Sequence, residues 1–216
     1  MLADGALDVA LVSSFEYLRN PIYTIVDDVS ISSDGPVYSV IVAHEGDISA
    51  IEEIALDPAS ATSVNLLRCL VVEKKLKARL SASSAEKKNH ARLLIGDQAI
   101  RFRQQHPDCP IWDLGEEWKK QTGLPFVFAL WLIRPGVSSA GEIAAGLRAC
   151  RDTNMKRLAS LADAQPDFTP DFCKRYFQEN LRYKFGAQEK EGLLHFSSVC
   201  QQHGILSSAD APLSLT

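Results

Sequence analysis

The sequence predicts an α/β protein, because short apolar runs of strand length alternate with segments that have helical spacing. The chain has 216 residues, enough for one large domain or two small ones. Several apolar runs end directly in small hydroxyl, glycine or acidic residues, as the carboxyl ends of strands in an α/β sheet do. Ligands bind at that edge of such sheets, so we expect the functional site at these junctions.

Short apolar runs dominate the first half of the chain. The expected strands there are residues 7–12, 23–26, 37–42, 51–56 and 92–95. We expect the strand at 7–12 to be a parallel strand, which needs another strand and a helix beside it. Met1-Leu-Ala3 fits a last helical turn that Gly5 stops, and Ser33-Asp-Gly-Pro36 fits a turn. Residues 62–79 have helical spacing.

The second half of the chain is mostly helical in pattern. Residues 126–133 are apolar on both faces, which is typical of a central strand. The expected helices are 113–121, 139–164, 170–185 and 188–203, with Pro170 in a first turn and Gly186 and Gly204 as stops. Residues 81–88 are polar and predict a loop, and residues 209–216 predict a frayed tail.

Composition excludes several classes of function. The formal net charge is −4 and no basic cluster stands out, so nucleic-acid binding has no electrostatic support. Five cysteines are widely spaced without a C-x-x-C motif, which indicates reduced and mostly buried thiols. The five histidines have no metal-ligand spacing, so we expect neither a metal nor a cofactor. Motifs of nucleotide-binding, dinucleotide-binding and serine-hydrolase sites are absent from the sequence.

No segment of the sequence predicts a membrane or export signal. The longest apolar run, 126–133, is far shorter than the roughly 20 residues that a membrane helix needs. The first residues have neither a basic start nor a long apolar core. We therefore expect a soluble, cytoplasmic protein that binds a small molecule. Its oligomeric state, monomer or homodimer, stays open.

Five sequence blocks carry a family resemblance. They are VSSFEY (12–17), SISSDGPVYS (30–39), DPASATSVNLLR (57–68), LIGD (94–97) and TGLPFVFALW (122–131). In this order and spacing they resemble the chorismate dehydratase of the futalosine route to menaquinone, over about residues 2–186. The resemblance implies a two-domain, periplasmic-binding-protein-like (type II) α/β fold with a cleft between the domains.

The resemblance also implies how the chain divides. Residues 1–39 and 135–216 would form a discontinuous first domain, and residues 40–134 the second. The runs 37–42 and 126–133 would be paired crossover strands. Members of the family begin with a β-α-β segment before the strand at 7–12, so we expect an N-terminally truncated fold and a site that is only partly present. An open sheet edge, an uncovered apolar face and little activity on chorismate are the expected results.

The implied reaction removes water from chorismate and gives 3-enolpyruvylbenzoate. The protein must hold two carboxylates, remove a ring proton and help hydroxide to leave. Ser60, Thr62 and Ser63 lie where a strand gives way to a helix, and free N–H groups and the helix dipole attract anions there. A plain helix cap explains the same residues, but the resemblance favours substrate binding.

The resemblance implies that Ser39, on the first crossover strand, is the catalytic or substrate-contacting serine. A local hydrogen bond of a small strand residue is the alternative. Ser13 and Ser14 should line the floor of the cleft, while Ser33 in an ordinary turn sequence is a weaker candidate. If Ser39 and Thr62 hold substrate, their replacement by alanine should weaken catalysis and change stability little.

Gly96 and Asp97 follow the strand at 92–95. Gly96 allows the backbone to approach a ligand closely, whereas Asp97 fits either a helix start or a substrate contact.

Two other functions fit the same fold. A solute-binding or sensing protein would use the same anion-holding helix start without chemistry. The sister enzyme of the pathway, 1,4-dihydroxy-6-naphthoate synthase, is the closer enzymatic alternative. The SDGPVYS and TGLPFVFA segments fit the dehydratase better.

Overall fold

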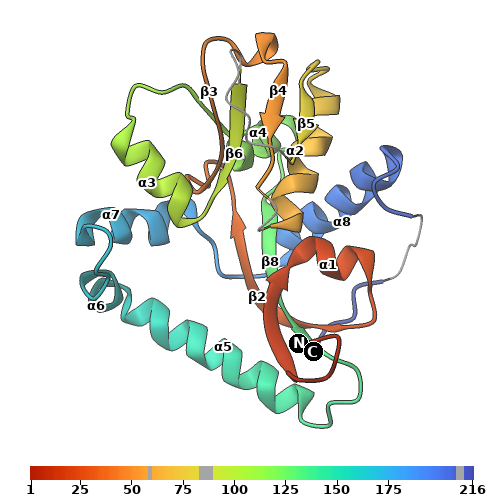
Figure 1. The fold of residues 1–216 in the computed structure, drawn as a ribbon. Coiled ribbons are helices and arrows are strands. Elements are labelled where there is room, and N and C mark those ends of the chain that lie inside the picture. The colour runs from red at the N-terminus through yellow and green to blue at the C-terminus, as the bar shows by residue number, and fades with distance from the viewer. Residues whose placement is uncertain (58–59, 83–89, 208–211) are drawn as a thin grey trace.

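The computed structural model describes residues 1–57, 60–82, 90–207 and 212–216 and contains two β-sheets. The smaller sheet has the strand order β1 (Val9–Ser13), β8 (Phe126–Ile133) and β2 (Thr24–Ser33). The central strand β8 runs antiparallel to both neighbours. Figure 1 shows β2 and β8 side by side, with both chain termini near the same end of this sheet.

The larger sheet is built from the middle of the chain. Its order is β5 (Arg79–Ser81), β4 (Glu53–Ala55), β6 (His90–Ile95), β3 (Val40–His44) and β7 (Ile111–Asp113). Strand β4 is parallel to β5 and β6, whereas β3 is antiparallel to β6 and β7. The sheet is therefore mixed.

Helices cover both sheets and connect them. Those of the described residues are α1 (Ser14–Arg19), η1 (Ile48–Ala50), α2 (Ala61–Glu73), α3 (Asp97–Gln105), α4 (Leu114–Thr122), α5 (Ala140–Lys156), α6 (Leu158–Asp163), α7 (Pro170–Arg175), the π-helical η2 (Tyr176–Asn180) and α8 (Ala187–Gln202). Among the described residues, no helix has both the length and the hydropathy needed to cross a membrane.

One continuous core joins the two sheets. Phe15 of α1, Phe126 of β8 and Phe196 of α8 pack into the same buried cluster as Leu66 of α2 and Trp118 of α4. Burial of such large side chains contributes about 1.5–3 kcal/mol each. The N-terminal, middle and C-terminal parts of the chain are thus held to one another by shared apolar surface.

Strand β8 has the predicted bounds, 126–133, but its expected partner is wrong. It pairs with β2, where Ser33 lies opposite Phe126, rather than with residues 37–42. The first full strand residue after the crossing segment is Val40, and β3 belongs to the larger sheet. A run that is apolar on both faces indicates a central strand, because here α5 and α8 cover the smaller sheet. The run does not indicate which strand lies beside it, since the burial would be the same with another partner.

The division into domains at residues 39 and 134 stays a prediction. A division drawn along the sheets would place β8 with β1 and β2, because these three strands form one sheet. The chain would then cross between the sheets near Ser33 and again just before Phe126.

Strand β1 confirms the expected strand but not its direction. It pairs with β8 in antiparallel register, Val9 opposite Ile133, instead of lying in a parallel pair. The spacing of apolar residues indicates which side chains are buried. It does not indicate whether a strand is parallel or antiparallel to its neighbour, because both arrangements bury the same side chains. Among the described residues β1 forms the edge of the smaller sheet, and Leu11 on it is 42% exposed, as expected for an uncovered strand.

Three predicted helices are shorter than expected. Helix α2 ends at Glu73, because Lys75 adopts a left-handed conformation with φ of +53° and the chain then enters β5. The helix expected over 139–164 breaks into α5 and α6 at Arg157, and the one expected over 170–185 ends in the π-helical turn at Asn180. Apolar spacing continues past these breaks because the following turns also pack on the core.

The expectation of a frayed tail is wrong for the residues described at the C-terminus. Ile25 of β2 donates to Ser214 O at 2.8 Å and accepts from Thr216 N at 3.0 Å. Strand edges carry unpaired backbone groups, and the tail satisfies those of β2. The loop expected over 81–88 falls largely on 83–89, which lie outside the described residues.

Candidate active site

The starts of α1 and α2 meet in a cluster of hydroxyl groups. The Thr62 Oγ1 lies within hydrogen-bonding distance of Ser13 Oγ and is 3.2 Å from Ser14 Oγ. It also accepts from the Phe15 backbone N–H at 3.0 Å, while Ser13 Oγ accepts from Thr62 N–H at 2.9 Å. Ser14 donates in addition to Val127 O of β8 at 2.7 Å. The three predicted residues Ser13, Ser14 and Thr62 therefore lie together.

Burial separates the roles within this hydroxyl cluster. Ser14 and Thr62 are both 0% exposed, whereas Ser13 is half-buried. The Thr62 oxygen is thus enclosed among its hydrogen-bond partners, as buried polar groups usually are. The Thr62 hydroxyl holds the start of α1 against the start of α2, and its expected contact with substrate stays a prediction.

Ser60 and Ser63 form the cap of α2. Ser60 Oγ accepts from Ser63 N–H at 3.3 Å and lies 3.1 Å from Ser63 Oγ. This is the ordinary geometry of an N-cap residue. Ser60 is half-buried and Ser63 is buried, so Ser60 and Ser13 are the hydroxyl side chains of this cluster that reach solvent.

Ser39 lies at a second junction, directly before β3. Its Oγ accepts a hydrogen bond from the Tyr176 hydroxyl at 2.7 Å, and its carbonyl oxygen accepts from Gly96 N–H at 2.7 Å. Its own donor interaction, with Val37 O, is long at 3.5 Å. Ser39 is 5% exposed. Two distant segments, at Gly96 and Tyr176, therefore converge on this serine.

The environment of this serine keeps Tyr176 protonated. Burial raises the pKa of Tyr176 above its ordinary value, and the charges of Asp97 and Asp113 act in the same direction. The hydrogen bond to Ser39 acts against them. A neutral phenol donates, so Tyr176 directs the hydroxyl hydrogen of Ser39 away from itself.

Asp113 holds the backbone that leads into Ser39. Its carboxylate accepts from the N–H groups of Val37 at 3.1 Å and Tyr38 at 2.8 Å. Burial raises the pKa of Asp113, and these hydrogen bonds and the charge of Arg103 oppose that rise. Arg103 lies 3.6 Å from the carboxylate and covers the Tyr38 ring at 3.8 Å from its centroid. Tyr38 has a left-handed φ of +67°, which these contacts maintain.

Gly96 and Asp97 lie at the start of α3. Gly96 is the N-cap residue with φ of +62°, a conformation that favours glycine. Asp97 is exposed in the first turn and makes no capping hydrogen bond there. It influences Tyr176 through its charge rather than by contact.

Ser33 does not face an open site. It is 1% exposed and donates to Gly35 O at 3.1 Å. Gly115 of α4 packs against this turn so closely that a Cβ atom there would lie 2.7 Å from Ser33 Oγ. The structure thus uses Ser33 in a turn beneath α4, and no hydrogen bond of the described residues joins it to the two junctions above.

The sequence does not predict Tyr176. It lies 137 residues after Ser39, inside a segment whose only visible signal is helical spacing. The π-helical turn at 176–180 could not be recognised from that spacing. Such turns are frequent at functional sites, but they become visible only in the structure.

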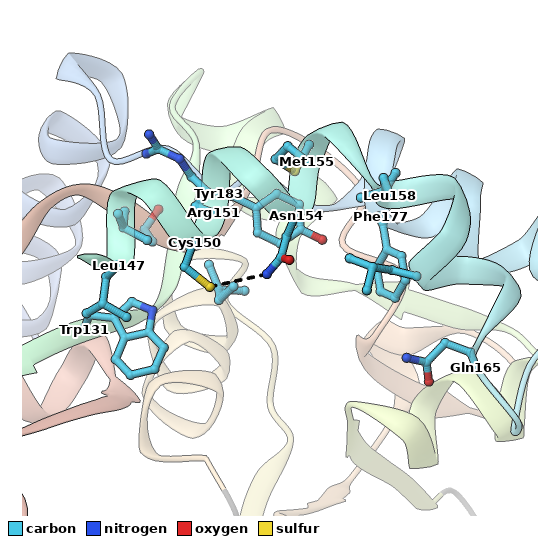
Figure 2. A pocket seen from close by; sticks show the side chains of 14 residues that line it. Trp131, Leu147, Cys150, Arg151, Asn154, Met155, Leu158, Gln165, Phe177 and Tyr183 are labelled. Carbon is cyan, nitrogen blue, oxygen red and sulfur yellow. Dashed lines mark hydrogen bonds between the residues drawn. The ribbon is translucent and has the colours of Figure 1, made fainter. Parts of the chain in front are cut away.

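A separate cavity of about 320 Å³ lies between α5 and the smaller sheet (Figure 2). None of the predicted site residues lines it. The lining is mostly apolar, with the aromatic rings of Trp131, Phe177 and Tyr183. Arg151 is the one cationic residue that lines it among those described, and Asp28 and Asp152 already pair with its guanidinium. This cavity is poorly suited to a ligand with two carboxylates.

Comparison with known proteins places these observations in a family. A family model described as menaquinone biosynthesis matches residues 1–202. The chain belongs to this family.

Two relatives found by sequence comparison are both named chorismate dehydratase. A chorismate dehydratase of Thermus thermophilus is 30% identical over 222 aligned residues, which cover 92% of this chain and 82% of the relative. A chorismate dehydratase of Campylobacter jejuni is 28% identical over 199 residues, or 90% of this chain and 76% of the relative.

Solved structures agree on the fold of this menaquinone-biosynthesis family member. A protein of Archaeoglobus fulgidus superimposes with a TM-score of 0.68 at 20% identity over 94% of this chain and 82% of its own. An ABC transporter of Parabacteroides distasonis gives 0.63 at 14% identity, over 100% of this chain and 82% of its own. The expected periplasmic-binding-protein-like α/β fold is confirmed.

Proposed function

We propose that this menaquinone-biosynthesis family member is a chorismate dehydratase, a hydro-lyase that forms 3-enolpyruvylbenzoate on the futalosine route. The similarity to the Thermus thermophilus enzyme over 92% of the chain is the observation that carries the proposal. The two hydroxyl-rich junctions support it, because hydroxyl groups can donate hydrogen bonds to an anionic substrate and a helix start attracts anions. The proposal places the enzyme in the cytoplasm with a small-molecule substrate.

The first role in the proposed mechanism is carboxylate binding. Ser60 would hold one carboxylate of chorismate through its hydroxyl, assisted by the positive end of the α2 helix dipole; the N–H groups of Thr62 and Ser63 are already bonded to Ser13 Oγ and Ser60 Oγ. Ser13 is half-buried beside them and would add a hydroxyl donor. Thr62 would position these groups, since its hydroxyl is buried among them.

The second role is to stabilise the departing hydroxyl group. The ring C–H proton and the ring hydroxyl leave together as water, and the electron pair of the C–H bond completes the aromatic ring. Ser39 would be the catalytic residue, donating its hydroxyl hydrogen to the leaving oxygen. Tyr176 would be a positioning residue, because its donated hydrogen bond fixes the direction of the Ser39 hydroxyl.

The test is incubation of the purified chain with chorismate, followed by mass-spectrometric detection of 3-enolpyruvylbenzoate. Ser39→Ala should lower turnover about 10- to 150-fold, the value of one hydrogen bond to a charged group. Ser160→Ala, at an exposed serine of α6, is the matched control and should turn over like the parent. Tyr176→Phe should lower kcat with little change in KM.

Three outcomes would reject the proposal in different ways. Chorismate that raises the thermal stability of the chain without giving product would indicate a solute-binding or sensing protein. Turnover of a cyclised futalosine derivative in place of chorismate would indicate the naphthoate synthase. No product and no stabilisation would remove chorismate as the ligand altogether.

The rate of the 216-residue chain is a separate part of the proposal. We expect it to be well below that of the Thermus thermophilus enzyme. Among the described residues β1 is the edge strand of the smaller sheet, and its Leu11 is 42% exposed. Equal rates for the two proteins would refute this expectation without affecting the assignment of the reaction.

A further inference from the structure

Two buried cysteines face each other away from both junctions. Cys69 on α2 and Cys200 on α8 are 131 residues apart in sequence, yet their Sγ atoms are 3.6 Å apart. Their side chains are 1% and 0% exposed. A disulfide has an S–S distance of about 2.05 Å, so bond formation needs the two sulfur atoms to approach by roughly 1.5 Å. Helices α2 and α8 pack directly on each other, which keeps the thiols together (Figure 1).

One of the two cysteines lines a cavity. A cavity of about 170 Å³ between α2, α4 and α8 is lined by Cys69 but not by Cys200. Glu73, Gln121 and His195 give its wall polar groups that can hold water. A water molecule occupies about 30 Å³ of liquid, so hydrogen peroxide has ample room beside Cys69.

The second thiol stays protonated. The contact with the Cys69 sulfur and burial both raise the pKa of Cys200 above its ordinary value. A protonated, enclosed thiol is protected from direct attack by an oxidant. Cys69 is therefore the first site of oxidation and Cys200 the group that resolves it.

We propose that Cys69 and Cys200 form a modification site at which a hydroperoxide converts the two thiols into a disulfide joining α2 to α8. In the first step Cys69 releases its proton and its sulfur attacks one peroxide oxygen. The O–O bond breaks, the other oxygen leaves as water after taking up a proton, and Cys69 becomes a sulfenic acid. In the second step Cys200 attacks that sulfur, the S–O bond breaks, and the hydroxyl leaves with the proton of Cys200 as water.

The test uses the whole chain and needs no substrate. The protein is treated with hydrogen peroxide, remaining thiols are blocked, and the chain is digested with trypsin. Cleavage after lysine and arginine places Cys69 in peptide 69–74 and Cys200 in peptide 191–216. The expected product is these two peptides joined, lighter by two hydrogens than their sum, and separated again by dithiothreitol.

Variants separate the two roles. Cys200→Ala should leave Cys69 as a sulfenic acid that dimedone traps, whereas Cys69→Ala should leave Cys200 reduced. Cys150→Ala, at the exposed cysteine of α5, is the matched control and should cross-link like the parent. The disulfide should also raise Tm by on the order of 10 °C, because it closes a loop of more than 100 residues.

Two results would overturn the proposal. One is full oxidation of Cys150 in the parent with peptides 69–74 and 191–216 still unlinked. The other is oxidation of Cys200 at an undiminished rate in Cys69→Ala. Both are read from the folded chain, so they stand apart from any outcome of the chorismate assay.

Discussion

The hydroxyl of Thr62 provides the sharpest test of how the candidate site is built. It accepts the Phe15 backbone N–H at 3.0 Å and contacts the hydroxyls of Ser13 and Ser14. Thr62→Val keeps the shape of the side chain and removes only this hydrogen-bonding group. Thr62→Ser is the matched control, because it keeps the hydroxyl and removes one methyl group.

The magnitude follows from which groups lose their last partner. In Thr62→Val, Ser14 keeps its bond to Val127 O at 2.7 Å and Ser13 keeps its bond from the backbone N–H of position 62. The Phe15 N–H is then the one group of this cluster left without an acceptor. A buried unsatisfied donor costs about 1–3 kcal/mol. For a chain of this size that lowers Tm by about 2–12 °C.

The assay is amide hydrogen exchange at Phe15 together with thermal unfolding. Thr62→Val should speed exchange of this amide by about 5- to 150-fold, the equivalent of 1–3 kcal/mol. Thr62→Ser should leave Phe15 protected and cost about 0.8 kcal/mol for the lost methyl group. Unchanged protection of Phe15 and a parental Tm in Thr62→Val would refute the positioning role. Thr62 would then return to the substrate-binding role expected from the sequence.

Three further predictions concern other parts of the molecule. Ser39→Ala should keep the fold and lower chorismate turnover about 10- to 150-fold, measured by product formation. Burial lowers the pKa of His44 below 6.5, so the contribution of His44 to stability is complete above pH 6.5 and is lost as the pH falls through the lowered pKa. Urea unfolding should therefore give a free energy of unfolding that decreases from pH 7 to pH 5, and His44→Gln should make this decrease smaller. Gly192→Ala should lower the free energy of unfolding by about 1–3 kcal/mol, because its Cβ would collide with the Pro125 carbonyl oxygen. Gly146→Ala, with open space around it, should raise the free energy of unfolding by about 0.5–1 kcal/mol. Equal melting temperatures of the two variants would contradict the close packing of α8 on the residue before β8.

The candidate site could be predicted only in part, and the reason differs between residues. Ser60 is recognisable because a helix cap is encoded within a few residues. Tyr176 is invisible, since nothing near it in sequence indicates that a strand start 137 residues away will accept its hydrogen bond. The sequence predicts Thr62 as a ligand contact, but its complete burial follows from the way α1 packs on α2, which no local pattern encodes.

The sequence by itself determined the features of the fold that depend on local burial and local hydrogen bonding. The bounds of β8 follow from eight consecutive apolar residues, and the start of α4 follows from Asp113, whose side chain caps it by accepting from Glu116 N–H. Tertiary structure alone decided direction and partnership. It set the antiparallel pairing of β1 with β8, the pairing of the C-terminal residues with β2, and the approach of Cys69 to Cys200. The residues of a strand or helix indicate by their own pattern that it is buried. Which element packs against it depends on the path of the whole chain.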